Sequence, residues 1–145
     1  MTIKRMDHVG IVVEDLTAAT EFFVELGMEL LGEGPAEGAW IDGIVGLDDV
    51  RVDVAYLRTP DGQGAIELTK FRSPLAGTAE PSAPANTLGL RRVMFTVDDI
   101  DDTVARLQPM GGELIGTVEK YGDSHRLCYL RGPQGIIVSL AEELS

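Results

Sequence analysis

The sequence predicts an α+β fold of two tandem βαβββ modules, and an internal repeat is the first observation that supports this class. Asp7–Leu16 and Arg91–Ile100 follow one pattern at a shift of 84 positions, which continues without a gap to residue 33 of the first copy. The identical pairs include Val9 with Val93, Val13 with Val97, Asp15 with Asp99, Gly27 with Gly111 and Glu29 with Glu113. A repeat at fixed spacing indicates two structural units of the same design.

The second observation is that strand and helix patterns follow each other in the same order in both copies. Residues 3–13 alternate in hydropathy, which predicts a strand with His8 on the face opposite Val9 and Ile11. Asp15 is a helix N-cap residue, and Gly27 is suited to the end of the helix that follows. The first module is completed by predicted strands at residues 28–31, 50–58 and 65–71.

The second copy repeats this order. Its first strand is predicted at residues 90–97, and Asp99 caps a helix with an apolar stripe of Ile100, Val104 and Leu107. The remaining strands are predicted at residues 113–118, 124–131 and 135–140. We therefore assign residues 1–145 to one domain with a first module at 1–71, a proline-containing linker at 72–88 and a second module at 89–145.

Residues 32–45 are rich in glycine and predict a flexible loop that carries Trp40 and several aliphatic side chains. These side chains are either core anchors or a lid. Each module alone is expected to have too little apolar surface for a stable fold, because domains well below 100 residues are only marginally stable. Two curved sheets that pack side by side would form one curved mixed sheet around a shared trough. His8, Glu67, Arg92 and Ser139 are predicted to project into it.

Composition restricts the class of function. The net charge of −12 makes nucleic acid an improbable partner, because binding to phosphates needs clustered Lys and Arg. Cys128 is the only cysteine, so no intrachain disulfide can form. No apolar run is long enough to cross a membrane, and the N-terminus lacks the apolar core of a signal peptide. These features favour a cytoplasmic protein with no membrane partner.

The chain resembles the vicinal-oxygen-chelate superfamily, which includes glyoxalase I, extradiol dioxygenases and bleomycin-resistance proteins. The resemblance covers the whole chain and rests on four segments, which are residues 7–13, 65–68, 95–101 and 132–138. It implies a glyoxalase-like fold and a homodimer with the ligand pocket between subunits. In metal-dependent members, it also implies a divalent ion held in the trough by four side chains, mostly His and Glu.

Only two of those four positions match. His8 and Glu67 are possible ligands, whereas Arg92 stands where the family has a histidine and Ser139 where it has a glutamate. A guanidinium has no free lone pair and stays charged, and a serine hydroxyl is a poor ligand for a hard ion. We therefore predict no metal and no other cofactor, with His8 and Glu67 as residual metal candidates. Arg92 is predicted to replace the ion by pairing with Glu67.

Two classes of function stay open, and the sequence favours the first. The first is a metal-independent binding protein that sequesters a bulky aromatic natural product or antibiotic, as bleomycin-resistance proteins do. The second is a divergent isomerase, lyase or dioxygenase that uses His8 and Glu67, with a metal or with Glu67 as general base. The predicted ligand-binding side chains are His8, Trp40, Tyr56, Glu67, Phe71, Arg92, Met94 and Ser139.

Overall fold

The computed structural model describes residues 2–145, so Met1, the first residue of the predicted first module, lies outside the described residues. The chain divides into two compact units, of which unit 1 ends at Thr78 and unit 2 comprises Ala79–Ser145. Each unit contains one mixed sheet, and the predicted α+β class is confirmed. No helix among residues 2–145 has the length and apolar character needed to cross a membrane.

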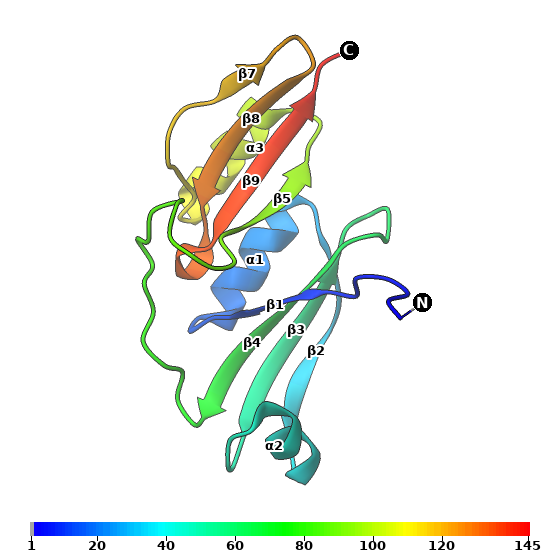
Figure 1. The fold of residues 1–145 in the computed structure, drawn as a ribbon, viewed down its shortest axis with the longest axis vertical. Helices are drawn as coiled ribbons and strands as arrows, with labels where there is room; N and C mark the ends of the chain where they lie inside the picture. The colour runs from blue at the N-terminus through cyan, green and yellow to red at the C-terminus, as the bar shows by residue number, and fades with distance from the viewer. Residues whose placement is uncertain (1) are drawn as a thin grey trace. The chain divides into compact units, whose positions relative to one another are not determined.

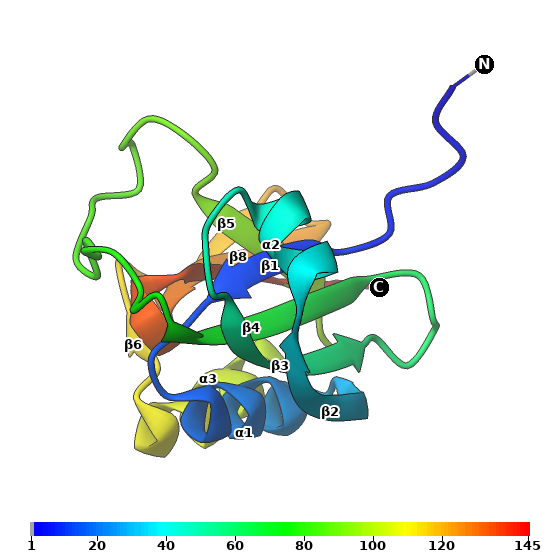
Figure 2. The same ribbon diagram turned by 90° about the horizontal axis from the view of Figure 1, so that it is seen from below.

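Unit 1 places its two helices on opposite faces of a four-stranded sheet (Figures 1 and 2). The strand order is β1-β4-β3-β2, with β1 parallel to β4 and the other neighbours antiparallel. The elements are β1 (Val9–Val12), α1 (Leu16–Leu26), β2 (Glu29–Glu37), α2 (Ala39–Val45), β3 (Arg51–Arg58) and β4 (Ala65–Ser73). One face of the sheet is therefore covered by α1, and part of the other face lies beneath the short α2.

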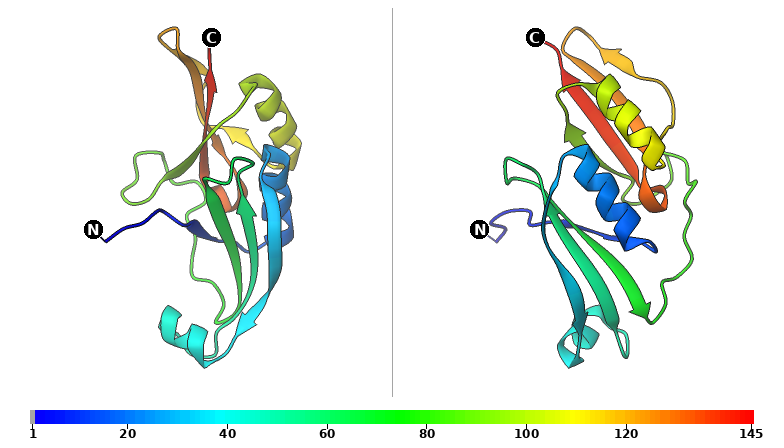
Figure 3. Two further views of the ribbon diagram at one scale, coloured as in Figure 1. Left: turned by 90° about the vertical axis from the view of Figure 1, so that its right-hand side faces the viewer. Right: turned by 180° about the vertical axis from the view of Figure 1, so that it is seen from behind.

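Unit 2 also consists of a mixed sheet with a helix along one face, and α3 lies along β8 and β9 (Figure 3, right). The strand order is β5-β9-β8-β6, β7 pairs with β8, and β5 runs parallel to β9 as β1 does to β4. The elements are β5 (Arg92–Thr96), α3 (Ile100–Leu107), β6 (Glu113–Leu114), β7 (Glu119–Tyr121), β8 (His125–Arg131) and β9 (Ile137–Glu143). Single 3₁₀ turns follow α3 and precede β9.

The equivalent aspartates cap equivalent helices, as predicted. The Asp15 carboxylate accepts a hydrogen bond from the Ala18 N–H at 2.9 Å, and Asp99 accepts one from the Asp102 N–H at 3.0 Å. In unit 2, Glu142 also accepts from the Ile100 N–H at 2.8 Å, so β9 fixes the start of α3. These bonds satisfy amide groups that have no partner within the first turn of a helix.

Each unit has its own apolar core between its sheet and its long helix. In unit 1, the aromatic rings of Phe22 and Phe23 are fully buried and meet edge to face. In unit 2, the fully buried large side chains are Ile100, Leu107, Leu130, Ile137 and Leu140. Burial of such side chains contributes about 1.5 to 3 kcal/mol each, which makes these two layers the main source of stability.

The structure corrects the predicted loop at residues 32–45. β2 continues to Glu37 as an edge strand that tolerates Pro35, and α2 then occupies Ala39–Val45. Of the glycines that suggested a loop, Gly32 and Gly34 lie in β2, Gly43 lies within α2, and Gly38 flanks this helix. Gly38 precedes it with φ 126°, and Gly46 ends it with φ 78°, conformations that favour glycine.

Several strand limits were also wrong. The strand predicted at residues 3–13 is reduced to β1, because residues 2–8 have no strand beside them in the ladder with β4. The strand predicted at residues 113–118 is reduced to the two residues of β6, and β7 was not predicted. β7 has no buried residue, so it lacks the apolar alternation by which a strand is recognised.

The rate at which the buried thiol of Cys128 reacts can report local or global unfolding of unit 2. Cys128 lies on β8, is 4% exposed, and burial raises the pKa of its thiol. Because the thiolate is the reactive form, we expect a thiol reagent such as DTNB to label the folded protein at pH 8 far more slowly than the unfolded chain. Equal rates in buffer and in denaturant would contradict this burial.

Candidate ligand-binding site

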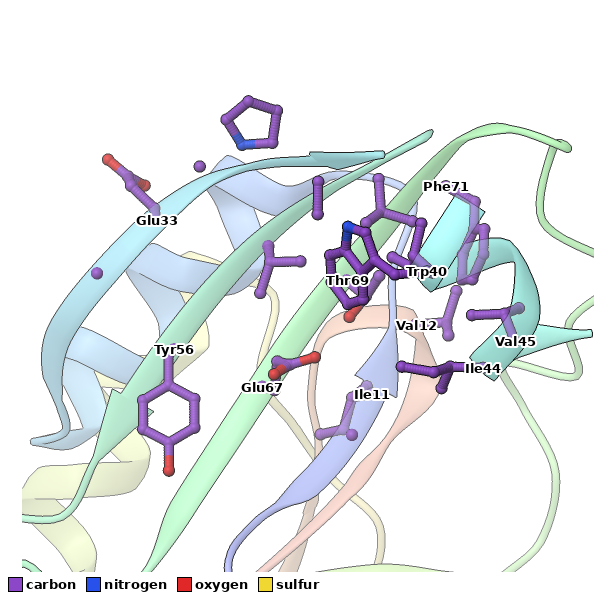
Figure 4. Close-up of a pocket in the computed structure, with 18 residues that line it drawn as sticks. Ile11, Val12, Glu33, Trp40, Ile44, Val45, Tyr56, Glu67, Thr69 and Phe71 are labelled. Carbon is purple, nitrogen blue, oxygen red and sulfur yellow. The ribbon is translucent and has the colours of Figure 1, made fainter. Parts of the chain in front are cut away.

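Unit 1 contains a cavity of about 720 Å³ on the face of its sheet opposite α1 (Figure 4). Strands β1 to β4 form its floor, and α2 forms one wall. Apolar side chains dominate the lining, with a few polar groups between them. The lining residues are Gly10, Ile11, Val12, Gly32, Glu33, Gly34, Pro35, Ala36, Trp40, Ile41, Ile44, Val45, Val52, Val54, Tyr56, Glu67, Thr69 and Phe71.

Strand register explains why these side chains face the same space. The ladder pairs Gly10 with Glu67 and Glu67 with Tyr56, so these three lie in one row across the sheet. The next row on the same face contains Val12, Thr69 and Val54. Glycines at positions 10, 32 and 34 have no atom within 4 Å of where a Cβ would lie. The cavity floor is therefore lowered where glycine replaces a side chain.

Helix α2 brings apolar side chains to the cavity (Figure 4). Ile41 is 9% exposed and packs with Val50 and Val52, which anchors the helix. By contrast, Trp40 is 61% exposed and Ile44 is 76% exposed, although both line the cavity. Both side chains expose apolar surface to water, and a bound molecule would bury this surface.

Asp42 holds α2 against the start of β3. Its carboxylate accepts hydrogen bonds from the Val50 N–H at 2.8 Å and the Asp49 N–H at 3.2 Å. We expect Asp42→Ala to destabilise the protein by about 1 to 3 kcal/mol, because Val50 is buried and its amide would lose its partner. Denaturant unfolding measures this effect, and Asp48→Ala is a neighbouring control on the exposed connection. Equal stability of the two variants would contradict the anchoring role.

The polar end of the cavity contains Glu67, and His8 lies beside it. The His8 Nε2 is 3.7 Å from a Glu67 carboxylate oxygen, and the Tyr56 ring meets the imidazole edge to face at a centroid distance of 5.7 Å. The His8 Nδ1 is 2.7 Å from the Asp7 carboxylate. This hydrogen bond is the main cause that lowers the pKa of Asp7. An imidazole is thus placed between two carboxylates, one of which lines the cavity.

The equivalent row in unit 2 holds different chemistry. β-ladder register places Met94, Ser139 and Tyr129 in one row, as it places Gly10, Glu67 and Tyr56 in unit 1. The Arg92 guanidinium lies over the Tyr129 ring at 5.1 Å, where His8 contacts Tyr56 in unit 1. Ser139 is 4% exposed, whereas Met94 is 55% exposed. A tyrosine ring therefore contacts the side chain at each of the two equivalent positions, His8 in unit 1 and Arg92 in unit 2.

The predicted site residues thus fall into two groups. Trp40, Tyr56, Glu67 and Phe71 line the unit 1 cavity, and His8 contacts two of them. Arg92, Met94 and Ser139 belong to unit 2, and the pairing of Arg92 with Glu67 stays a prediction. Sequence reasoning did not select Asp7, Asp42, Val12, Val54 or Thr69 for the site. Strand alternation would have found the last three.

The donor set does not fit the four-ligand ion that the resemblance implies for metal-dependent members of the family. His8 and Glu67 supply one imidazole and one carboxylate, while Arg92 offers no lone pair at the third position. Ser139 at the fourth position is a weak ligand. Across residues 2–145, no three His, Cys, Asp or Glu side chains gather in a group that could hold a metal ion.

Comparison with known proteins confirms the family resemblance of the sequence. The family model described as the Glyoxalase/Bleomycin resistance protein/Dioxygenase superfamily matches residues 5–140. The uncharacterized protein YaeR of Escherichia coli K12 is 30% identical over 97% of this chain and 98% of its own length. The crystal structure of a glyoxalase family protein from Bacillus cereus is 48% identical, with a TM-score of 0.96 over 100% of this chain and 97% of the other.

A more distant structure shares the fold. TnmS3, described as an antibiotic binding protein from Streptomyces sp. CB03234, is 20% identical, with a TM-score of 0.63 over 99% of this chain and 98% of its own. At this level of identity the likeness concerns the fold, and function has to be argued from the site.

Proposed function

Because the chain belongs to the Glyoxalase/Bleomycin resistance protein/Dioxygenase superfamily, we propose that it is a metal-independent binding protein that sequesters a bulky aromatic small molecule. The observation that carries this proposal is the apolar cavity of unit 1, with Trp40 and Ile44 exposed along it. Its volume of about 720 Å³ lies in the ordinary range of small-molecule sites, about 300 to 1,000 Å³.

The shape and chemistry of the lining favour a planar apolar ligand. Trp40 and Phe71 offer two aromatic surfaces, and Val12 and Val54 offer an aliphatic floor. Aromatic pairs gain about 0.5 to 1.5 kcal/mol beyond the burial of their area. Binding by stacking and desolvation needs no metal, which agrees with a donor set of only two suitable side chains.

Charge favours ligands that are neutral or cationic. Residues 1–78 contain 14 Asp and Glu against 6 Lys and Arg, a net charge of −8. Two carboxylates, Glu33 and Glu67, line the cavity, and none of its lining residues is basic. An acidic field attracts cationic compounds and repels anionic ones. A cytoplasmic homodimer that protects the cell from an aromatic antibiotic is the form of this function that we favour.

The second candidate is an enzyme, and the Asp7–His8–Glu67 array is the observation that favours it. Glu67 lines the cavity and is half-buried, so it could accept a proton from a bound substrate as a general base. His8, whose Nε2 lies 3.7 Å from the Glu67 carboxylate, would then influence the charge of that carboxylate. This candidate predicts a change in the chemical structure of the bound molecule, which binding alone does not.

The test uses the full chain after treatment with a chelator. We expect a panel of natural products with aromatic groups, including a planar polycyclic anthracycline and the glycopeptide bleomycin, to contain compounds that raise the melting temperature with saturation. Mass spectrometry should recover them unchanged. Binding that requires added Mn²⁺, Ni²⁺ or Zn²⁺ would contradict metal independence. Recovery of a converted compound would support the enzyme, and no stabilisation by any compound would overturn the binding function.

A further inference from the structure

We propose that Asp7 is a positioning residue that makes His8 and Glu67 a pair of hydrogen-bond acceptors, and that this pair selects ligands with a hydroxyl or amine group on an aromatic body. The inference rests on the proposed function, because it names the chemical class of molecule that the unit 1 cavity takes. The residues of this inference lie at the polar end of the cavity, whereas Trp40 and α2 line its apolar part.

The first step is the tautomer of His8. The Asp7 carboxylate can only accept hydrogen bonds, so the His8 Nδ1, 2.7 Å away, must carry a proton. In a neutral imidazole the second nitrogen then has a free lone pair. Asp7 thereby fixes Nε2 of His8 as the acceptor, as a carboxylate does for many histidines that bind a partner through their other nitrogen.

The second step is the direction of that lone pair. Nε2 faces a Glu67 oxygen at 3.7 Å, which is too long for a hydrogen bond, and a carboxylate oxygen can only accept. The edge-to-face contact with Tyr56 restrains the ring of His8 in this orientation. Two acceptors are thus held side by side at the polar end of the cavity. An ammonium group placed between them could donate to both, and a hydroxyl could donate to one of them.

The third step is selection between ligands. Both acceptors are only about one-third exposed, since the side chain of His8 is 33% exposed and that of Glu67 is 35% exposed. A ligand that covers them with an apolar group removes water without replacing its hydrogen bonds, which is costly. A ligand that brings a hydroxyl gives one of them a hydrogen bond, and an ammonium group can give a hydrogen bond to each. An anionic group would meet Glu67 directly and be rejected.

Four pyrene derivatives with one body and different heads test this selection. The probes are 1-methylpyrene, 1-pyrenemethanol, 1-pyrenemethylamine and 1-pyrenecarboxylate. For the native chain we expect 1-pyrenemethanol to bind about tenfold more tightly than 1-methylpyrene, a value typical of one hydrogen bond to a charged acceptor. The amine should bind at least as tightly as the alcohol, and the carboxylate should bind most weakly. The two neutral probes exclude a general effect of the acidic surface.

Variants separate the positioning role from a structural one. In Asp7→Ala and Glu67→Gln, the preference for the alcohol over the methyl probe should fall to about twofold, while Asp7→Asn should retain part of it through its carbonyl oxygen. Glu21→Gln removes one charge from the exposed side of α1, far from the cavity face, and should keep the full preference. Nitrogen-15 NMR at pH 8 should show His8 protonated at Nδ1 in the native chain and at Nε2 in Asp7→Ala.

The outcomes distinguish the two proposals. An equal affinity for methyl and alcohol probes in the native chain would overturn donor selection and leave the binding function intact. An unchanged preference in Asp7→Ala, or an unchanged His8 tautomer, would overturn the role of Asp7. Failure of all four probes to bind would count against the proposed function itself.

Discussion

Trp40→Ala is expected to weaken binding of a planar aromatic ligand about 30-fold, with almost no change in the free energy of unfolding. The indole lines the cavity but is 61% exposed in the free protein, so it contributes little to the core. A ligand that stacks on it would bury this area, and aromatic anchors of this kind are commonly worth about 2 kcal/mol. Calorimetric titration measures the affinity, and denaturant unfolding measures the stability.

Two variants control this result. Trp40→Phe keeps an aromatic face and should lose only a small part of the affinity. Val24→Ala removes a partly exposed apolar side chain from α1, on the other side of the sheet, and should not change the affinity. If Trp40→Ala binds the ligand as tightly as the native chain, the proposal that Trp40 of α2 contacts the ligand is wrong.

Gly135→Ala is expected to destabilise unit 2 by about 3 kcal/mol or more. Gly135 has φ 77°, and a Cβ at this position would overlap the backbone of Pro81. Arg131 reinforces the same contact, because its guanidinium donates to the carbonyl oxygens of Gly135 at 3.1 Å and Pro81 at 3.3 Å. The cost combines left-handed backbone strain with overpacking against a fixed segment. Chemical denaturation of the full chain measures it.

Gly122→Ala is the matched control for this substitution. Gly122 also has a positive φ, 56°, but a Cβ there would meet nothing within 4 Å. Its cost should therefore be limited to backbone strain, about 1 to 2 kcal/mol. If both variants lose the same stability, the segment around Pro81 moves away freely, and the close approach to Gly135 contributes nothing.

Most of the fold could be predicted because each copy of the repeat contains local sequence signals for its strands and helix. Alternating apolar residues, Asp15 and Asp99 as caps and Gly27 as a helix end each act within a few residues of the chain, so their structural result can be inferred from sequence. The lengths of β2 and β6 could not be inferred in this way. They depend on pairing with strands that lie far away in the sequence, as in the long ladder of β2 with β3.

Helix α2 was missed because the glycines at positions 32, 34, 38 and 43 indicate a loop. A helix of seven residues is marginal alone, and it forms here through tertiary contacts of Ile41 and Asp42. The contact of Asp7 with His8 was missed for another reason. Neighbouring residues in a strand point to opposite faces, but residues 2–8 are not in a strand, so both side chains can meet.

The most direct test of the central claim uses Trp40, the only tryptophan in the chain, as a reporter at the cavity. Chelator-treated protein is titrated with 1-pyrenemethanol while tryptophan fluorescence is recorded. We predict saturable quenching with one site per chain, unchanged by added Mn²⁺, Ni²⁺ or Zn²⁺, and full recovery of the intact probe. Quenching that appears only after a metal ion is added would contradict metal-independent binding in unit 1.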